Sequence, residues 1–202
     1  MSDKILTAPQ GDRPKQFTRD EIGWTPWLEP LSEGELTDRH RAGLVEPSRA
    51  KSPYFMLLAR DPEILEARTR TDKDIFYNPS GGLPRAEREL AATATSRSNG
   101  CIFCASVHAR FAATYSKRAD DMQRLLDEGI SVDLDPRWNA IVAASVALTA
   151  TPVQFDGRSI ERLRQEGLDD LAILDVIQSA AFFGWANRLM LSLGEPTPSA
   201  KR

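Results

Sequence analysis

The sequence from Glu89 to His108 reads ELAATATSRSNGCIFCASVH and holds both cysteines of the 202-residue chain and one of its two histidines. At about 100° per residue, Cys101, Cys104 and His108 fall within roughly 60° of arc on one face of a helix. Two thiols three residues apart, followed by a histidine one turn later, indicate that the sulfur serves chemistry rather than packing. The rest of the chain is therefore expected to be the scaffold of this site.

The start of this helix should favour an ionised thiol. Asn99 and Gly100 supply a cap and a break, so Cys101 lies in the first turn, where exposed N–H groups and the helix dipole stabilise a thiolate. His108 lies one turn beyond Cys104 and can exchange a proton with it directly or through one water. Two thiols with this spacing can close into a disulfide at a helix start, so the pattern predicts a reversible dithiol.

Glu89 lies on the preceding helix, at the edge of a side that Ala86, Leu90 and Ala94 are expected to bury. A carboxylate at that place can serve a proton relay. Most glutamates in a charge-rich first turn are simply solvated, however, so the spacing alone favours a solvated Glu89 over one with a role in the site.

Helix starts recur along the chain after residue 52. Capping side chains stand directly before prolines, as at the first position of a helix, in Ser52-Pro53, Asp61-Pro62 and Asp135-Pro136. The sequence predicts helices at residues 53–60, 62–77, 84–98, 101–117, 120–128, 136–149, 157–166 and 170–193. No stretch alternates as a half-buried strand does, so we expect an all-α fold without a sheet, with one helical domain at 53–202. The last helix is apolar over more than one stripe, which indicates burial on several sides or contact with another subunit.

Residues 1–52 read as an irregular N-terminal arm because five prolines interrupt any long helix. Trp24 and Trp27 should anchor this arm on the helical body or on a partner subunit. A short helix is expected within 32–44. His40, between two arginines in this segment, is expected to have no catalytic role.

The composition is that of an ordinary globular protein, with 41% hydrophobic residues and a net charge of -3. No tract of like charges indicates nucleic acid as a partner, and no apolar run is long enough for a signal peptide or a membrane span. We therefore expect a cytoplasmic protein. Structural disulfides rarely persist in that compartment, so the Cys-x-x-Cys pair indicates transient redox chemistry or a metal.

Other uses of a Cys-x-x-Cys pair fit this sequence less well. A thioredoxin-like fold needs βαβ units, and c-type haem needs a histidine directly after the second cysteine, where Ala105 stands. Zinc would find four ligands in Cys101, Cys104, His108 and Glu89, but structural zinc usually recruits a second Cys or His pair. We expect no metal and no cofactor, with zinc as the alternative.

The pattern Glu-(eleven residues)-Cys-x-x-Cys-x-x-x-His resembles the alkylhydroperoxidase D-like branch of the carboxymuconolactone decarboxylase family, and more narrowly its peroxidase-related proteins of about this length. The likeness covers residues 84–118 most strongly, through Arg85–Leu90 and Ser96–Cys101, and extends more loosely to Trp24–Trp27 and Phe183–Leu193. It implies an alkylhydroperoxidase D-like helical bundle that assembles into homo-oligomers. A decarboxylase proper is not expected, because that branch does not rely on a dithiol.

The resemblance also implies a role for each site residue. Cys104 would attack an organic hydroperoxide and become a sulfenic acid, and Cys101 would resolve it to a disulfide that a dithiol or lipoyl-type donor reduces. Glu89 and His108 would form the proton relay. Reasoning from thioredoxin-type motifs would instead make Cys101 the nucleophile, because it is nearest the helix start.

A function of another class fits the same residues. In a non-enzymatic redox sensor or assembly module, the Cys101–Cys104 disulfide would switch a binding surface instead of turning over peroxide. The sequence leaves both functions open, with the peroxidase favoured by the resemblance.

Overall fold

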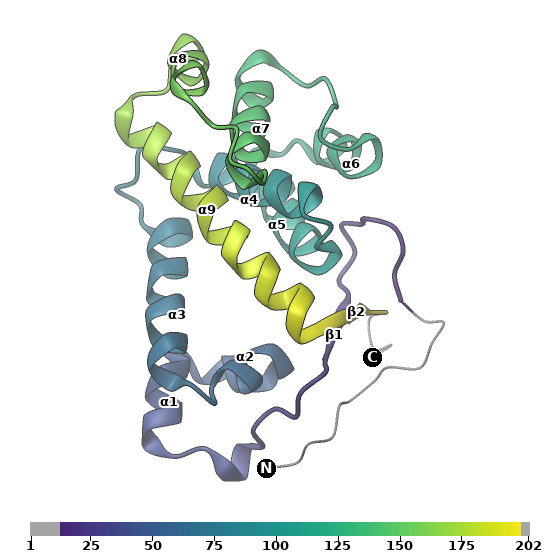
Figure 1. Cartoon of the computed structure of the whole chain (residues 1–202), viewed down its shortest axis with the longest axis vertical. Coiled ribbons are helices and arrows are strands. Elements are labelled where there is room, and N and C mark those ends of the chain that lie inside the picture. The colour runs from purple at the N-terminus through teal and green to yellow at the C-terminus, as the bar shows by residue number, and fades with distance from the viewer. Residues whose placement is uncertain (1–12, 199–202) are drawn as a thin grey trace. The chain divides into compact units, whose positions relative to one another are not determined.

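The computed structural model describes residues 13–198, so the first twelve residues of the expected arm and residues 199–202 lie outside the described part. The all-α prediction is confirmed, and the eight expected helices occur with ends within about two residues of those predicted. The helices are α1 (Asp38–Leu44), α2 (Pro53–Leu58), α3 (Pro62–Tyr77), α4 (Arg85–Ser98), α5 (Ile102–Ser116), α6 (Ala119–Glu128), α7 (Pro136–Thr149), α8 (Gly157–Gln165) and α9 (Asp170–Leu193), with short 3₁₀ helices at Glu33–Glu35 and Pro47–Lys51 (Figure 1).

The expectation that the chain has no sheet is wrong. Strands β1 (Gly23–Pro26) and β2 (Gly194–Thr197) pair antiparallel, with Trp24 opposite Pro196. Each strand has only four residues, including a glycine and a proline, so neither shows an alternating pattern. The pairing also joins the two ends of the chain, which no local sequence signal reveals.

The described chain divides into two compact units. The first comprises residues 22–74 and 189–198, together with 13 and 14. It has its own core, in which the ring of Trp24 meets Tyr54 edge to face at 5.6 Å between centroids. One cluster of its buried aliphatic residues comprises Leu36, Leu44, Met56, Ala59 and Leu65.

The second unit comprises residues 15–21 and 75–188 and contains the whole of the predicted site. Helix α4 packs against α5 and α7, while α5 also packs against α6 (Figure 1). Every residue of α4 from Glu87 to Ser96 is buried. A helix enclosed on all sides carries polar residues only where they find partners, so each polar residue of α4 is expected to have one.

Arg88 ties the loop before α4 to that helix. Its guanidinium donates to the backbone oxygens of Leu83 at 2.6 Å, Ile75 at 2.8 Å and Asn78 at 3.0 Å, and it lies 3.7 Å from Asp175. A buried arginine with this many acceptors has a structural role, since its donors are already occupied.

Among residues 13–198, no helix combines the length and apolarity needed to cross a membrane.

We expect Asp135→Ala to lower the free energy of unfolding by about 1–2 kcal/mol, because Asp135 caps α7. Its carboxylate accepts from the backbone N–H groups of Arg137 and Trp138, each at 3.1 Å. Asp135→Asn keeps this cap and should cost less in urea denaturation. Burial opposes ionisation, yet the Trp138 N–H and Arg118 hold the pKa of Asp135 below its usual value. A carboxyl group whose pKa is lowered by folding stabilises the folded state at pH values above its usual pKa. This stabilisation should be lost as the pH falls through the lowered pKa of Asp135.

Candidate functional site

Cys101 occupies the N-cap of α5, and the chain reaches it through a sharp turn at Gly100. Gly100 has φ +78°, a conformation that favours glycine, and the Cys101 N–H donates to Ser96 O at 2.9 Å. Asn99 does not cap this helix as expected. Its side-chain amide donates to Thr149 Oγ1 and Asn187 Oδ1, both at 3.0 Å, because buried partners far away in sequence satisfy it better.

The two cysteines are reduced and buried, with 2% of Cys101 and 6% of Cys104 exposed. The Cys104 thiol hydrogen-bonds the Cys101 sulfur and lowers the pKa of Cys101 below that of an ordinary thiol. Burial raises this pKa, but the backbone N–H groups of Cys104 and Phe103 and the amide of Asn187 lower it further. The first thiol of the pair is therefore placed to be a thiolate, as the helix-start argument predicts.

Glu89 and His108 form a buried hydrogen bond, with Oε2 of Glu89 2.6 Å from Nδ1 of His108. A carboxylate only accepts, so Nδ1 carries the shared proton and Nε2 is the ring nitrogen left to take up another. His108 lies one turn after Cys104 on α5. Thus α4 and α5 bring all four predicted site residues together in one unit.

Glu89 is more deeply buried than its predicted place at the edge of the buried side suggests. Only 1% of its surface is exposed. The difference arises because α4 is enclosed on all sides. Burial of a carboxylate requires compensating partners, and Glu89 has two, His108 on Oε2 and Arg85 on Oε1 at 3.1 Å.

Arg85 is a site residue that the sequence reasoning missed. Its guanidinium lies 4.1 Å from the ring centroid of Tyr77 and 4.3 Å from that of Tyr115. Burial opposes its charge, but the Glu89 carboxylate and the Tyr77 hydroxyl hold the pKa of Arg85 above its usual value. Arg85 therefore places a positive charge beside the buried Glu89 carboxylate. The i, i+4 spacing of Arg85 and Glu89 on one helix is the signal that could have identified this pair.

Two phenylalanines hold the imidazole of His108. Phe183 of α9 meets it edge to face at 4.0 Å between centroids, and Phe76 lies 5.3 Å away. These rings restrict the orientation of the imidazole and reduce the access of water to the Glu89–His108 pair. No sequence signal indicated that either ring belongs to the site.

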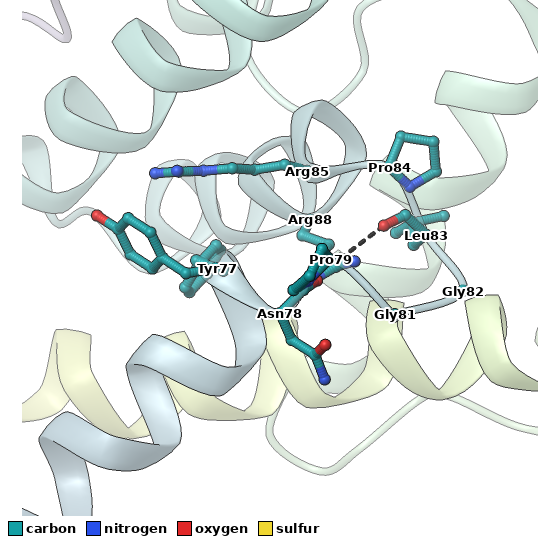
Figure 2. Close-up of a pocket in the computed structure, with 10 residues that line it drawn as sticks. Tyr77, Asn78, Pro79, Gly81, Gly82, Leu83, Pro84, Arg85 and Arg88 are labelled. Atoms are coloured by element: carbon teal, nitrogen blue, oxygen red, sulfur yellow. Dashed lines mark hydrogen bonds between the residues drawn. The ribbon is translucent and has the colours of Figure 1, made fainter.

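A cavity of about 400 Å³ lies on the Arg85 side of this pair, lined by residues 76–79, 81–85 and Arg88. Figure 2 shows the side chain of Arg85 extended past Tyr77. It also shows the hydrogen bond from Arg88 to the backbone oxygen of Leu83, which holds the loop before α4. Neither cysteine lines the cavity. Glu89 and His108 do not line it either, so Arg85 is the member of this network that faces the cavity.

The remaining sequence predictions concern His40 and a metal. His40 lies outside this unit and accepts a hydrogen bond at Nδ1 from the Thr37 N–H at 3.1 Å, within the capping box of α1. Within the described part of the chain, no group of three or more His, Cys, Asp or Glu side chains is arranged to hold a metal ion.

Comparison with known proteins places this site in a family context. Residues 62–147 match the model of the carboxymuconolactone decarboxylase family. The match covers less than half of the 202-residue chain. The matched range runs from α3 into α7 and contains Glu89, Cys101, Cys104 and His108. No curated protein matches the sequence.

Solved structures share the fold. The alkylhydroperoxidase AhpD core of an uncharacterized peroxidase-related protein from Ralstonia eutropha JMP134 has a TM-score of 0.71 and 24% identity, over 86% of this chain and 92% of that one. A peroxidase-related protein from Silicibacter sp. TM1040 has a TM-score of 0.71 and 22% identity, over 85% and 92%. The debrominase Bmp8 has a TM-score of 0.66 and 16% identity, over 82% and 88%. The fold thus occurs in proteins described by more than one chemistry.

We expect Arg85→Leu to lower the free energy of unfolding by about 2–3 kcal/mol, because it leaves the Glu89 carboxylate buried with one partner fewer. The double variant Arg85→Leu/Glu89→Gln should recover part of this loss, since no uncompensated charge remains. Arg70→Leu is the matched control, because Arg70 pairs with Glu66 at the same spacing but in solvent. It should change stability by less than about 0.5 kcal/mol. Equal losses for Arg70→Leu and Arg85→Leu in chemical denaturation would contradict the assignment.

Proposed function

We propose that this protein is a thiol-dependent peroxidase that reduces organic hydroperoxides through a Cys101–Cys104 dithiol and disulfide cycle. The observation that carries the proposal is the buried 2.6 Å hydrogen bond between Glu89 and His108, one helical turn from Cys104. A dithiol used only for packing or for a structural bridge needs no buried acid and imidazole beside it. Two ionisable groups kept out of water next to a thiol are suited to moving a proton.

The first step would be attack by the Cys104 thiolate on the terminal oxygen of the hydroperoxide. The S–O bond forms, the O–O bond breaks, and the departing alkoxide takes a proton from His108 to leave as the alcohol. Glu89 stabilises the imidazole in both protonation states through the hydrogen bond at Nδ1. Cys104 then carries the sulfenic acid.

The second step would be attack by the Cys101 thiolate on the sulfenic sulfur of Cys104. The S–S bond forms, the S–O bond breaks, and the hydroxyl leaves as water with a proton from the relay. The lowered pKa of Cys101 suits this role, because the resolving thiol must also be ionised to react. A dithiol or lipoyl-type donor would then reduce the disulfide and return both thiols.

Two further expectations concern assembly and location. Homo-oligomerisation, which the family resemblance implies and the apolar last helix agrees with, is supported by the exposed Leu171, Leu174 and Trp185 of α9. We retain a reducing, cytoplasmic setting as part of the proposal, since the thiols must return to the reduced state after each cycle.

We expect the reduced protein to consume an organic hydroperoxide over many cycles when excess dihydrolipoamide is supplied. Cys104→Ser should abolish consumption, because it removes the sulfur that attacks. In the absence of the dithiol donor, Cys101→Ser should react once and stop at the sulfenic acid, which mass spectrometry detects with a dimedone label. His108→Gln should slow turnover by about 100-fold or more, since the alcohol then leaves without a positioned proton donor.

The same assay separates the peroxidase from its alternatives. A wild-type protein that reacts once and stops, although the dithiol donor fully reduces its disulfide, would favour the redox sensor or assembly module. Stoichiometric zinc bound through both thiols, in protein purified under reducing conditions, would overturn the proposed cycle. An efficient Cys104→Ser variant would also contradict it.

A further inference from the structure

Asn187 of α9 is a wholly buried polar residue that the proposed cycle does not use. Its amide nitrogen donates to Ser96 Oγ at 3.0 Å, and its Oδ1 accepts from the amide of Asn99 at 3.0 Å. The same side chain hydrogen-bonds the sulfur of Cys101. Ser96 and Asn99 lie at the end of α4, so Asn187 joins the segment before the dithiol to α9 and to the first thiol.

The orientation of the Asn187 amide is fixed by its partners. Because Oδ1 faces an N–H donor of Asn99, the NH₂ group faces the other way, towards Ser96 and Cys101. Asn99 is itself held, since its amide oxygen accepts from Thr149 Oγ1 at 3.1 Å. Thr149 is the last residue of α7. A network with its polar groups paired in this way holds an N–H donor on the Cys101 sulfur without the cost of rearrangement.

We propose that Asn187 is a positioning residue of the dithiol, which holds Cys101 as the sulfur that leaves when an incoming thiol opens the Cys101–Cys104 disulfide. The proposal rests on the dithiol cycle proposed above. It specifies which sulfur is attacked and which one leaves when the disulfide is reduced. The donor thiolate attacks Cys104, its S–S bond to Cys104 forms, and the Cys104–Cys101 bond breaks. Both electrons of the broken bond go to Cys101, which leaves as a thiolate.

The chemistry of exchange supports this direction. In thiol–disulfide exchange the sulfur with the lower pKa leaves faster. The N–H groups of Cys104, Phe103 and Asn187 all stabilise the anionic form of Cys101. The Cys104 thiol, which contacts Cys101 directly, is neutral when it donates this hydrogen bond, as are the N–H donors. The bias thus comes mainly from neutral donors, so it should persist across the neutral pH range.

The first experiment uses the wild-type chain. The disulfide is formed with diamide, treated briefly with one equivalent of glutathione, quenched with acid and alkylated with N-ethylmaleimide. Mass spectrometry should then find glutathione on Cys104 and the alkyl label on Cys101. Glutathione on Cys101 and the label on Cys104 would overturn the proposal, as would equal amounts of both.

The second experiment measures the contribution of Asn187 itself. In a Cys104→Ser background, Cys101 is the single thiol, and its pKa follows from the pH dependence of iodoacetamide alkylation. Asn187→Ala should raise this pKa by about one pH unit, as expected for loss of one hydrogen bond to a charged sulfur. The control is Ser179→Ala, at another wholly buried position of α9, whose hydroxyl has no hydrogen-bond partner in the described part of the chain. It should leave the pKa unchanged.

The outcomes separate this proposal from the peroxidase itself. Diamide forms the disulfide without any peroxide, so the attacked sulfur is identified even if hydroperoxide turnover fails. A protein that turns over hydroperoxide normally but keeps the same Cys101 pKa after Asn187→Ala would overturn the role of Asn187 and leave the peroxidase intact. If Asn187→Ala does not fold, as judged by circular dichroism, the wild-type mapping of glutathione still identifies the leaving sulfur, and Asn187→Ser replaces Asn187→Ala in the pKa measurement.

Discussion

The hydrogen bond between Glu89 and His108 sets the main constraint on this structure. A carboxylate with 1% of its surface exposed loses its hydration, at a cost of several kcal/mol unless other groups replace the water. His108 and Arg85 take that place, one on each carboxylate oxygen. Each partner is in turn held by aromatic rings. Phe76 and Phe183 pack against His108, and Tyr77 lies under the guanidinium of Arg85. The packing of unit two around α4 therefore also holds the Glu89–His108 pair of the proposed relay.

Much of this could be predicted from local sequence. The capping residues before prolines mark helix starts because their conformational preferences act within a few residues. The row of Cys101, Cys104 and His108 follows from helical periodicity, which is equally local. Such signals placed the helices to within about two residues and put both thiols at the head of α5. Only the resemblance to a family, and not the spacing, pointed to Glu89.

What could not be predicted depends on contacts between distant segments. The pairing of Gly23–Pro26 with Gly194–Thr197 joins residues that share no local pattern. Asn99 looked like a cap, but its amide instead bonds Thr149 and Asn187, about 50 and 90 positions away. A short polar side chain beside a glycine favours a local cap unless a buried partner is available, and the sequence does not reveal that partner.

The dithiol is asymmetric, and this asymmetry reconciles two arguments that seemed opposed. Position at a helix start favours Cys101 as the more acidic thiol, whereas a base one turn away favours Cys104 as the nucleophile. The structure gives each sulfur a different neighbour, with hydrogen-bond donors on Cys101 and the imidazole one turn from Cys104. A thiol that resolves and later leaves benefits from a stable anion, while a thiol that attacks benefits from a base that takes its proton and returns it to the product. The two cysteines therefore need not compete for one role, since the two halves of a dithiol cycle make different demands on them.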